Sequence, residues 1–313
     1  MGSTRMGLRI AIFGQAAFGR EVTERLADAG HEIVGVYAPP EASRPDPLAQ
    51  LADQRSWRLF RYERFQRGGS AIPERVDEYR SLGAELNVMP FTTAILPEPI
   101  TDHPIHGSLC FHPSILPAYR GGAALAWQII LGETESGVSV FRVEGGVDAG
   151  PIAVQKRGVE ISSTDTTASL YFDKLYSLGV EAMLEAVERV ADGTLELSAQ
   201  REDEASFQGL ITDDVARIDW SRPAAEIDRL IRGCTPGPGA IAAYAGESVR
   251  LFGSRLIAGE CDAPTGTAIG SEGDELTISA GRALIAIAKI RRGEGKKLAA
   301  RDAGIEIGTR LGS

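Results

Sequence analysis

The stretch that decides the fold is residues 108–117, which read Ser108-Leu109-Cys110-Phe111-His112-Pro113-Ser114-Ile115-Leu116-Pro117. Its first five residues form a short apolar run that predicts a buried strand, and the prolines that follow end it. A side chain at the carboxyl end of a parallel strand projects into the crevice where open α/β sheets bind their ligands. His112 is therefore a candidate functional residue, although a histidine hydrogen-bonded within its own loop fits this segment equally well.

Similar apolar runs recur along the first half of the chain and alternate with helical patterns. The patterns predict strands at 8–13, 32–37 and 86–90 and helices at 19–29, 73–82 and 123–131. Strands that alternate with helices are typical of βαβ units. The first domain is therefore predicted to be α/β, with a parallel sheet covered by helices on both faces.

Two further apolar runs, 138–143 and 152–159, flank a glycine-rich loop, which predicts a hairpin with a long connection. Asp148 lies in this loop and is the second polar candidate, although aspartate is also a frequent turn residue. After the hairpin, Thr164 and Asp165 are expected to cap a long helix that continues toward residue 191.

The segment 196–206 is polar and has no periodicity, so it is predicted to be a linker between two domains, at 6–203 and 208–313. Beyond it a short helix is expected at 223–232. Short apolar runs then follow at 249–252, 267–269, 276–279 and 284–290. Short strands at such spacing predict a small β-barrel.

The composition is that of an ordinary folded protein, with 313 residues, 43% hydrophobic and 24% charged. No apolar stretch is long enough to span a membrane, so no membrane partner is expected. The three cysteines are odd in number and widely spaced, which fits neither a disulfide framework nor a C-x-x-C motif. A cytoplasmic protein is therefore expected. Met6 is as good a start as Met1, and residues 1–5 do not enter the fold prediction.

The net charge of −10 argues against a protein that coats nucleic acid. The excess is uneven, because from residue 207 onward 11 Arg and 3 Lys balance 14 acidic residues. The densest basic run comprises Lys289, Arg291, Arg292, Lys296, Lys297 and Arg301. This run is expected to be a solvated rim of the barrel, with an RNA contact as the alternative.

The first strand is followed by Gly14-Gln15-Ala16-Ala17-Phe18-Gly19, which leads into the first helix. A dinucleotide site needs a middle glycine in this turn and an acidic residue about 20 residues further on. Both are missing, because the second strand ends in Tyr37-Ala38-Pro39-Pro40. The turn therefore predicts tight packing of strand and helix and no NAD cofactor.

Nearly the whole chain resembles the family of enzymes that use 10-formyltetrahydrofolate, which includes methionyl-tRNA formyltransferase and the hydrolase domain of 10-formyltetrahydrofolate dehydrogenase. The hydrolase domain is the more similar of the two, at 84–91, at 106–108, at 112–117 and at 147–150. The segments 218–220, 231–233 and 238–240 resemble the start of the C-terminal domain of this family. The resemblance implies a Rossmann-like formyltransferase fold followed by a small barrel of the oligonucleotide-fold type.

The resemblance also implies roles for individual residues. His112 would hydrogen-bond the formyl oxygen and stabilise the tetrahedral intermediate, while Asp148 would orient the nucleophile and handle its proton. The formyl donor would be 10-formyltetrahydrofolate, and no metal is required. Residues implied in folate binding are Met89, Pro90, Phe91, Ser114, Ile115, Leu116 and Pro117.

Cys110 is an altered family position, because the formyltransferases of this family carry asparagine two residues before the histidine. An amide there would donate to the oxyanion, and a thiol is a weak substitute. Hydrolysis to tetrahydrofolate and formate is therefore the expected reaction. Transfer to an amino acceptor, such as initiator methionyl-tRNA, is the alternative, and a non-catalytic RNA-binding module is a third.

Overall fold

The structure is a computed structural model that describes residues 7–312, so Met6 lies outside the described residues. The chain forms two compact units. Within the described range, the first comprises residues 7–120, 137–157 and 175–207, and the second comprises 121–136, 158–174 and 208–312. The second unit thus includes two segments that precede the predicted linker, and the division at 203 and 208 stays a prediction. Among the described residues, no helix is long and apolar enough to cross a membrane.

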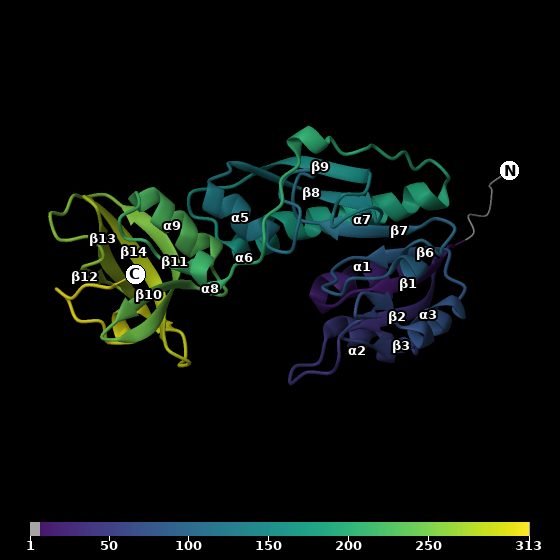
Figure 1. Cartoon of the computed structure of the whole chain (residues 1–313), viewed down its shortest axis with the longest axis horizontal. Coiled ribbons are helices and arrows are strands. Elements are labelled where there is room, and N and C mark those ends of the chain that lie inside the picture. Colours follow the sequence, from purple (N-terminus) through teal and green to yellow (C-terminus); the bar gives the residue numbers. More distant parts are fainter. Residues whose placement is uncertain (1–6, 313) are drawn as a thin grey trace. The chain divides into compact units, whose positions relative to one another are not determined.

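The first unit is built on a seven-stranded, mostly parallel sheet (Figure 1). Its order is β3 (Leu59–Arg61), β2 (Glu32–Ala38), β1 (Arg9–Phe13), β6 (Leu86–Met89), β7 (Ser108–His112), β8 (Glu135–Arg142) and β9 (Ile152–Glu160). The first five of these strands run parallel to their neighbours, and β8 runs antiparallel to β7. The predicted α/β class is therefore confirmed, and the strand prediction missed only the short β3 of this sheet.

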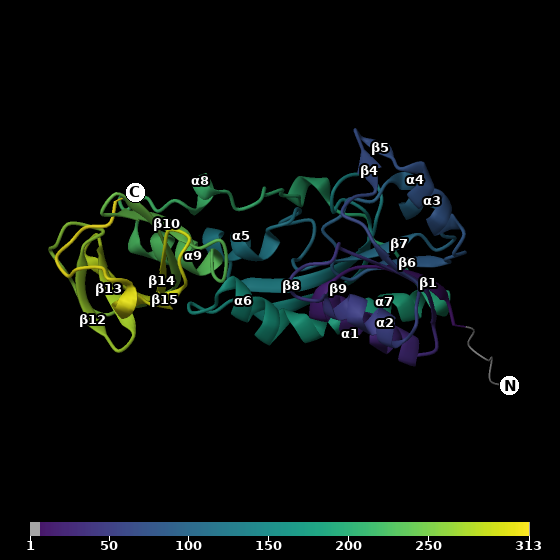
Figure 2. The same cartoon turned by 90° about the horizontal axis from the view of Figure 1, so that it is seen from below.

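Helices cover both faces of this sheet. One face carries α1 (Ala16–Asp28), α2 (Pro47–Gln54) and α7 (Tyr176–Ala191), and the other carries α3 (Pro73–Arg80) and α4 (Glu98–Thr101) (Figure 2). On the first face Phe111 packs against Phe18, and a Cβ on Gly179 would lie 2.6 Å from the Phe111 ring. On the second face the rings of Phe13 and Tyr37 stack at 4.5 Å. A small hairpin, β4 (Gln66–Arg67) and β5 (Ser70–Ala71), completes this part.

The predicted long helix is present, but it begins two residues later than expected. Thr166 is the N-cap, because its side chain accepts the Ser169 N–H while the Ser169 hydroxyl accepts the Thr166 N–H. Asp165 instead accepts from the Ser162 N–H and pairs with Lys174. The prediction that Thr164 and Asp165 form the cap was therefore wrong. The helix also has three parts, α6 (Thr167–Ser169), a π-helical turn (Leu170–Leu175) and α7.

The second unit is an antiparallel barrel. Its strands are β10 (Ala240–Tyr244), β11 (Glu247–Ile257), β14 (Ala283–Arg292), β13 (Glu275–Ala280) and β12 (Ala268–Glu272), with β15 (Leu298–Ala299) paired to β14. The last residues of the chain bridge both edges, since Gly312 pairs with Ala243 and Arg310 with Thr267. These bridges close the sheet, which confirms the predicted C-terminal barrel. The sequence pattern had missed β10.

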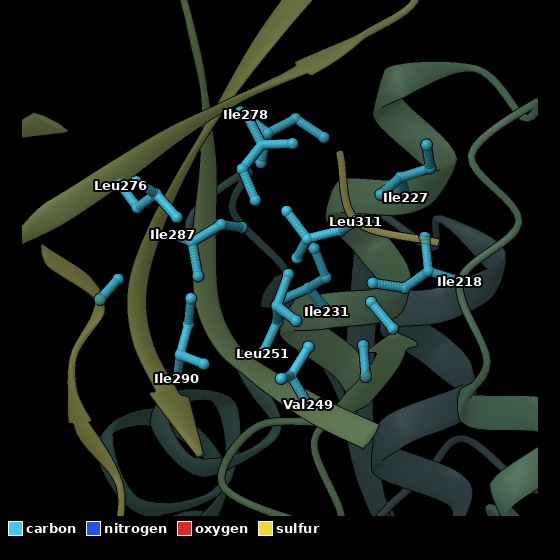
Figure 3. Packing of buried hydrophobic residues seen from close by; sticks show 14 of the residues in the cluster. Ile218, Ile227, Ile231, Val249, Leu251, Leu276, Ile278, Ile287, Ile290 and Leu311 are labelled. Atoms are coloured by element: carbon cyan, nitrogen blue, oxygen red, sulfur yellow. The ribbon is translucent and has the colours of Figure 1, made fainter. Parts of the chain in front are cut away.

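Besides α6, the second unit contains α5 (Ala124–Leu131), α8 (Asp213–Ala216) and α9 (Ala224–Gly233), followed by a short 3₁₀ turn (Ala300–Ala303). Helix α9 packs into the core of the barrel, where Ile227 and Ile231 face residues from the strands (Figure 3). The core side chains shown there are aliphatic and almost all fully buried: Ile218, Val249, Leu251, Leu276, Ile278, Ile287, Ile290 and Leu311.

Candidate active site

Alternate side chains of strand β7 point to opposite faces of the sheet in the first unit. Because side chains alternate along a strand, Cys110 and His112 share one face while Phe111 packs on the other. Met89 on β6 is the register partner of Cys110. The carboxyl ends of β6 and β7 therefore lie side by side, and their polar and sulfur-bearing side chains line one face of the sheet.

His112 is buried, and its two ring nitrogens have different surroundings. Nε2 lies 2.7 Å from the carbonyl oxygen of Tyr119, and Nδ1 lies 3.5 Å from Oδ2 of Asp148. A carbonyl oxygen can only accept, so Nε2 carries the proton and donates it to Tyr119. Nδ1 is therefore the nitrogen that can exchange a proton with a bound molecule.

The electrostatics keep this imidazole neutral. Burial lowers the pKa of His112, and the Asp148 carboxylate and the hydrogen bond to Tyr119 oppose that effect without overcoming it. The 3.5 Å separation between Nδ1 and Oδ2 exceeds a good hydrogen bond. It is short enough for both groups to contact one small molecule, so the pair can act as a base and an orienting acceptor.

Asp148 lies in the loop after β8, which begins beside the start of β7 and not beside its His112 end. Val143, just after β8, donates its N–H to Ser108 O at the start of β7, and the following loop returns over the face that carries Cys110 and His112. Asp148 itself has a φ of +53°, a left-handed conformation that is uncommon for residues other than glycine. Two residues later, a Cβ on Gly150 would lie 1.8 Å from Arg142 O, so only glycine fits there.

Cys110 is half-buried beside this pair. Its Sγ makes a weak 3.6 Å contact with Phe111 O. Burial, reinforced by the Asp148 charge, raises the pKa of the thiol, so it remains protonated at neutral pH. The position next to His112 therefore holds a neutral, weakly donating group.

The residues implied in folate binding fall into two groups. Phe91 is 43% exposed and lines a cavity of about 120 Å³ together with Gly14, Gln15 and Tyr37, whereas Met89 is buried. In the loop after His112, Ser114 and Leu116 are buried and Ile115 is half-buried. The Ser114 hydroxyl donates to Ala118 O. Contact of any of these residues with folate stays a prediction.

The other two implied residues, Pro90 and Pro117, contact neighbouring segments. A Cβ on Gly14 would lie 3.1 Å from the Pro90 ring, so Pro90 packs tightly against the first strand-to-helix turn. Pro117 accepts the N–H of Ser206 at its carbonyl oxygen.

At the turn that follows Gly14, a side chain of the protein accepts a backbone N–H of the first helix. The Asp46 carboxylate accepts the N–H of Ala16 at 2.7 Å and also caps α2 through the N–H groups of Leu48 and Ala49. A dinucleotide phosphate would need that helix N-terminus. A carboxylate already there repels an anion, which gives a physical reason for the departure from the dinucleotide signature.

Sequence reasoning missed the groups that hold His112 and Asp148. Tyr119 orients His112, and Gln200 contacts the Asp148 loop through the carbonyl oxygens of Asp148 and Gly150. Neither residue carries a sequence signal, because Gln200 lies in the aperiodic polar segment predicted to be a linker. Among residues 7–312, no group of three or more histidine, cysteine or acidic side chains could hold a metal ion.

Comparison with known proteins identifies the family of the chain. Residues 8–187 match the model of the formyl transferase family, and residues 210–304 match that of the formyl transferase C-terminal domain. The chain belongs to the formyl transferase family. It is 35% identical over 299 residues to methionyl-tRNA formyltransferase of Dinoroseobacter shibae, covering 93% of this chain and 95% of that protein. Family members of this kind are enzymes, which confirms the predicted class.

The formyl transferase chain is also similar to much longer proteins. It is 39% identical over 251 residues to mitochondrial 10-formyltetrahydrofolate dehydrogenase of Mus musculus, which is 80% of this chain and 27% of that protein. The chain therefore spans about a quarter of the length of that relative. This similarity agrees with the resemblance seen in the sequence motifs.

Solved structures share the formyl transferase fold at low sequence identity. HypX from Aquifex aeolicus, in complex with tetrahydrofolic acid, aligns with a TM-score of 0.70 and 20% identity over 95% of this chain and 47% of that chain. The N-formyltransferase from Helicobacter canadensis, in complex with folinic acid and dTDP-3-aminofucose, aligns with a TM-score of 0.66 and 17% identity over 91% of this chain and all of that chain. Both findings confirm the two-part fold.

Proposed function

We propose that this protein removes the formyl group from 10-formyltetrahydrofolate and passes it to water, giving tetrahydrofolate and formate. The observation that carries the proposal is the His112–Asp148 pair, with Nε2 committed to Tyr119 and Nδ1 facing the carboxylate at 3.5 Å. Similarity to 10-formyltetrahydrofolate dehydrogenase supports the choice of substrate. The three cysteines are free thiols, which supports a cytoplasmic location.

The reaction follows from the roles of the two ring nitrogens. A water molecule oriented by Asp148 attacks the formyl carbon, and Nδ1 of neutral His112 takes its proton, a step that the family resemblance assigned to Asp148. The resulting Nδ1–H donates to the oxyanion of the tetrahedral intermediate. When the intermediate collapses, the folate nitrogen receives the proton and leaves, and formate departs. His112 therefore acts first as a base and then as an acid, and Tyr119 keeps the ring in one orientation throughout.

Cys110 supports water over an amine as the acceptor. Loss of one oxyanion donor typically lowers a rate by about 10²- to 10³-fold. A protonated, half-buried thiol supplies little of that stabilisation. Water is small and present in excess, so it can serve as the acceptor in a site that lacks this donor.

The second candidate is transfer to an amino acceptor such as initiator methionyl-tRNA. Near full-length similarity to a methionyl-tRNA formyltransferase favours it. The second unit also carries a basic face, because Arg250 on β11 is the register partner of Arg291 on β14, and burial together with the charges of Arg291 and Lys289 lowers the pKa of Lys297. Among the described residues, Arg250 Nη1 and Arg291 Nε are buried atoms without a hydrogen-bond partner, while Arg250 Nη2 pairs with Asp213. Guanidinium groups bind phosphate well, so this face would take a phosphate where the phosphate replaces Asp213 as the partner of Arg250.

One assay separates the two candidates. The purified protein is incubated with 10-formyltetrahydrofolate alone, and then with charged initiator tRNA or an amino-sugar acceptor added. We expect equal amounts of tetrahydrofolate and formate in both cases. Formate that disappears in favour of formylated acceptor would establish the second candidate, and no tetrahydrofolate under any condition would refute both.

A further inference from the structure

The segment 198–206, here called the strap, is fastened to the first unit along its length. Ser198 exchanges two backbone hydrogen bonds with Ile152, at 2.8 and 2.9 Å. At the other end, Ser206 donates its N–H to Pro117 O and accepts the N–H of Arg120. The strap therefore lies across both loops that carry the catalytic pair, and it is not the free linker that its composition predicts.

Gln200 is the centre of the strap. Its Nε2 donates to Asp148 O at 2.8 Å and to Gly150 O at 2.6 Å, and its Oε1 accepts from Arg120 Nη2 at 2.8 Å and from Arg120 Nε at 3.1 Å. Both amide hydrogens and the amide oxygen are used. A flipped amide would set its oxygen against two carbonyl oxygens, so the partners fix its orientation.

Arg120 anchors this amide. Its side chain is about nine-tenths buried and its remaining donors reach both carboxylate oxygens of Glu202, at 2.7 and 3.1 Å. The guanidinium thus spans two residues of the strap with its planar fork of donors. The Asp148 carbonyl, Gln200 and Arg120 form one continuous chain of hydrogen bonds.

The same strap holds the partner of His112. The Ser206 hydroxyl accepts the N–H of Tyr119 at 2.9 Å, and the carbonyl of Tyr119 accepts from His112 Nε2 at 2.7 Å. His112 and Asp148 come from different strands and loops, yet Asp148 contacts the strap directly through its carbonyl oxygen, and His112 contacts it through Tyr119. The two side chains lie 3.5 Å apart between these attachments.

We propose that Gln200 is a positioning residue for the formyl-removing reaction, which holds Asp148 at its working distance from His112. The inference rests on the proposed function and adds a residue to it. Asp148 needs this support because a left-handed backbone is uncommon for residues other than glycine, even though aspartate adopts it more readily than most. With Gln200 holding the Asp148 and Gly150 carbonyls, the loop cannot relax toward an ordinary conformation and withdraw its carboxylate.

The test compares Gln200→Ala and Gln200→Glu with Arg201→Ala. Arg201 is the adjacent strap residue, its side chain is exposed, and it forms ion pairs with Asp203 and Glu204 of the strap itself, so it is a matched control. We expect kcat for tetrahydrofolate release to fall about 10²-fold in both Gln200 variants, because small displacements of a catalytic group cost about that much. KM for the folate should change little, and Arg201→Ala should behave as the unmodified protein.

The pH profile distinguishes positioning from simple loss of structure. If Asp148 withdraws, His112 loses the charge that raises its pKa, so the acid limb of kcat/KM should move to lower pH in Gln200→Ala. A Gln200→Ala protein with unchanged kcat and an unmoved acid limb would overturn the inference, as would a lower kcat with the acid limb unmoved. An unmodified protein without turnover would instead refute the proposed function.

Ser206→Ala covers the case in which both Gln200 variants fail to fold. This change removes only the hydroxyl contact to the Tyr119 N–H. It should lower kcat about 10-fold at an unchanged folate KM, since the Tyr119 carbonyl that orients His112 loses one of its supports. If the Gln200 variants do not fold and Ser206→Ala keeps full kcat, the strap holds only the fold and the inference is wrong.

Discussion

His112 Nε2 and the carbonyl oxygen of Tyr119 lie 2.7 Å apart, and this one contact decides which ring nitrogen takes part in the reaction. Because the carbonyl can only accept, the proton of the neutral ring stays on Nε2. Nδ1 then faces Asp148 with its lone pair available. The chemistry of the site therefore depends on a main-chain group seven residues away in the sequence.

The first prediction concerns the catalytic pair. His112→Ala and Asp148→Asn should each reduce turnover by about 10³-fold or more, because they remove the base and the group that orients the nucleophile. Asparagine is the suitable replacement at 148, since it tolerates the left-handed backbone better than alanine does. Tetrahydrofolate release measures the effect.

Stability should respond differently to the two changes. His112→Ala leaves the buried Tyr119 carbonyl without its donor, which costs about 1–3 kcal/mol of unfolding free energy. Asp148→Asn should cost less, because the carboxylate is partly exposed. Circular dichroism and thermal unfolding check both, and residual turnover above one-tenth in a folded variant would remove that residue from the mechanism.

The second prediction concerns pH and stability. Burial holds the pKa of His112 below its ordinary value of 6.5 in the folded state. At a pH between the lowered pKa of His112 in the folded chain and its ordinary pKa in the unfolded chain, the unfolded chain binds the proton and the folded chain does not. This residue therefore stabilises the fold above pH 6.5 and does so less as the pH falls. Urea unfolding should show that the free energy of unfolding changes less between pH 7.5 and pH 5.5 for His112→Gln than for the unmodified protein. An identical difference would mean that His112 titrates normally.

The third prediction concerns the strand-to-helix turn at Gly14. Because the Asp46 carboxylate occupies the Ala16 N–H, NAD and NADP should not bind, while 5-formyltetrahydrofolate should. Isothermal titration with the three compounds measures this. Asp46→Asn removes the charge and keeps an acceptor, so it shows whether repulsion matters. A micromolar affinity of the unmodified protein for either dinucleotide contradicts this account of the turn.

The sequence predicted those parts of the molecule that local pattern determines. His112 was found because apolar residues precede it in a strand, and the alternation of strands and helices gave the parallel sheet. The local pattern around Asp148 indicates only a turn residue, and it is the family resemblance that implies a role in orienting the nucleophile. The cap at Thr166 was misplaced by two residues, since Thr164, Asp165 and Thr166 are all good caps and the Ser169 contact decides between them.

The local sequence pattern does not predict polar contacts between residues that lie far apart in the chain. Gln200 meets Asp148 across 52 positions and Arg120 across 80, and no periodicity marks a residue that is held by main-chain carbonyls. The short strands β3 and β10 were missed for a related reason, because pairing with a neighbouring strand, and not the run itself, makes them strands. Local pattern and family resemblance therefore predict His112 and Asp148 as the site residues, and the structure shows which groups hold them.

The last prediction concerns Cys110, which shares a strand face with His112. Cys110→Asn restores an amide donor beside the oxyanion that Nδ1 of His112 would stabilise. The ratio of formylated amine to free formate should rise, by up to about 10²-fold, since one well-placed donor is worth as much as ~3 kcal/mol. The gain will be smaller if Met89, the register partner of Cys110, leaves too little room for the amide.

Cys261→Asn is the matched control for this change, because Cys261 is a half-buried thiol in the second unit and should leave the ratio unaltered. Both variants and the unmodified protein are assayed at equal folate and acceptor concentrations. An unchanged ratio in Cys110→Asn would show that a donor at this position does not choose between water and an amine. Efficient formylation by the unmodified protein would show that the thiol already suffices, so that Cys110 serves only to pack against its neighbours. A rise confined to Cys110→Asn would instead make this single position on β7 the residue that selects the acceptor.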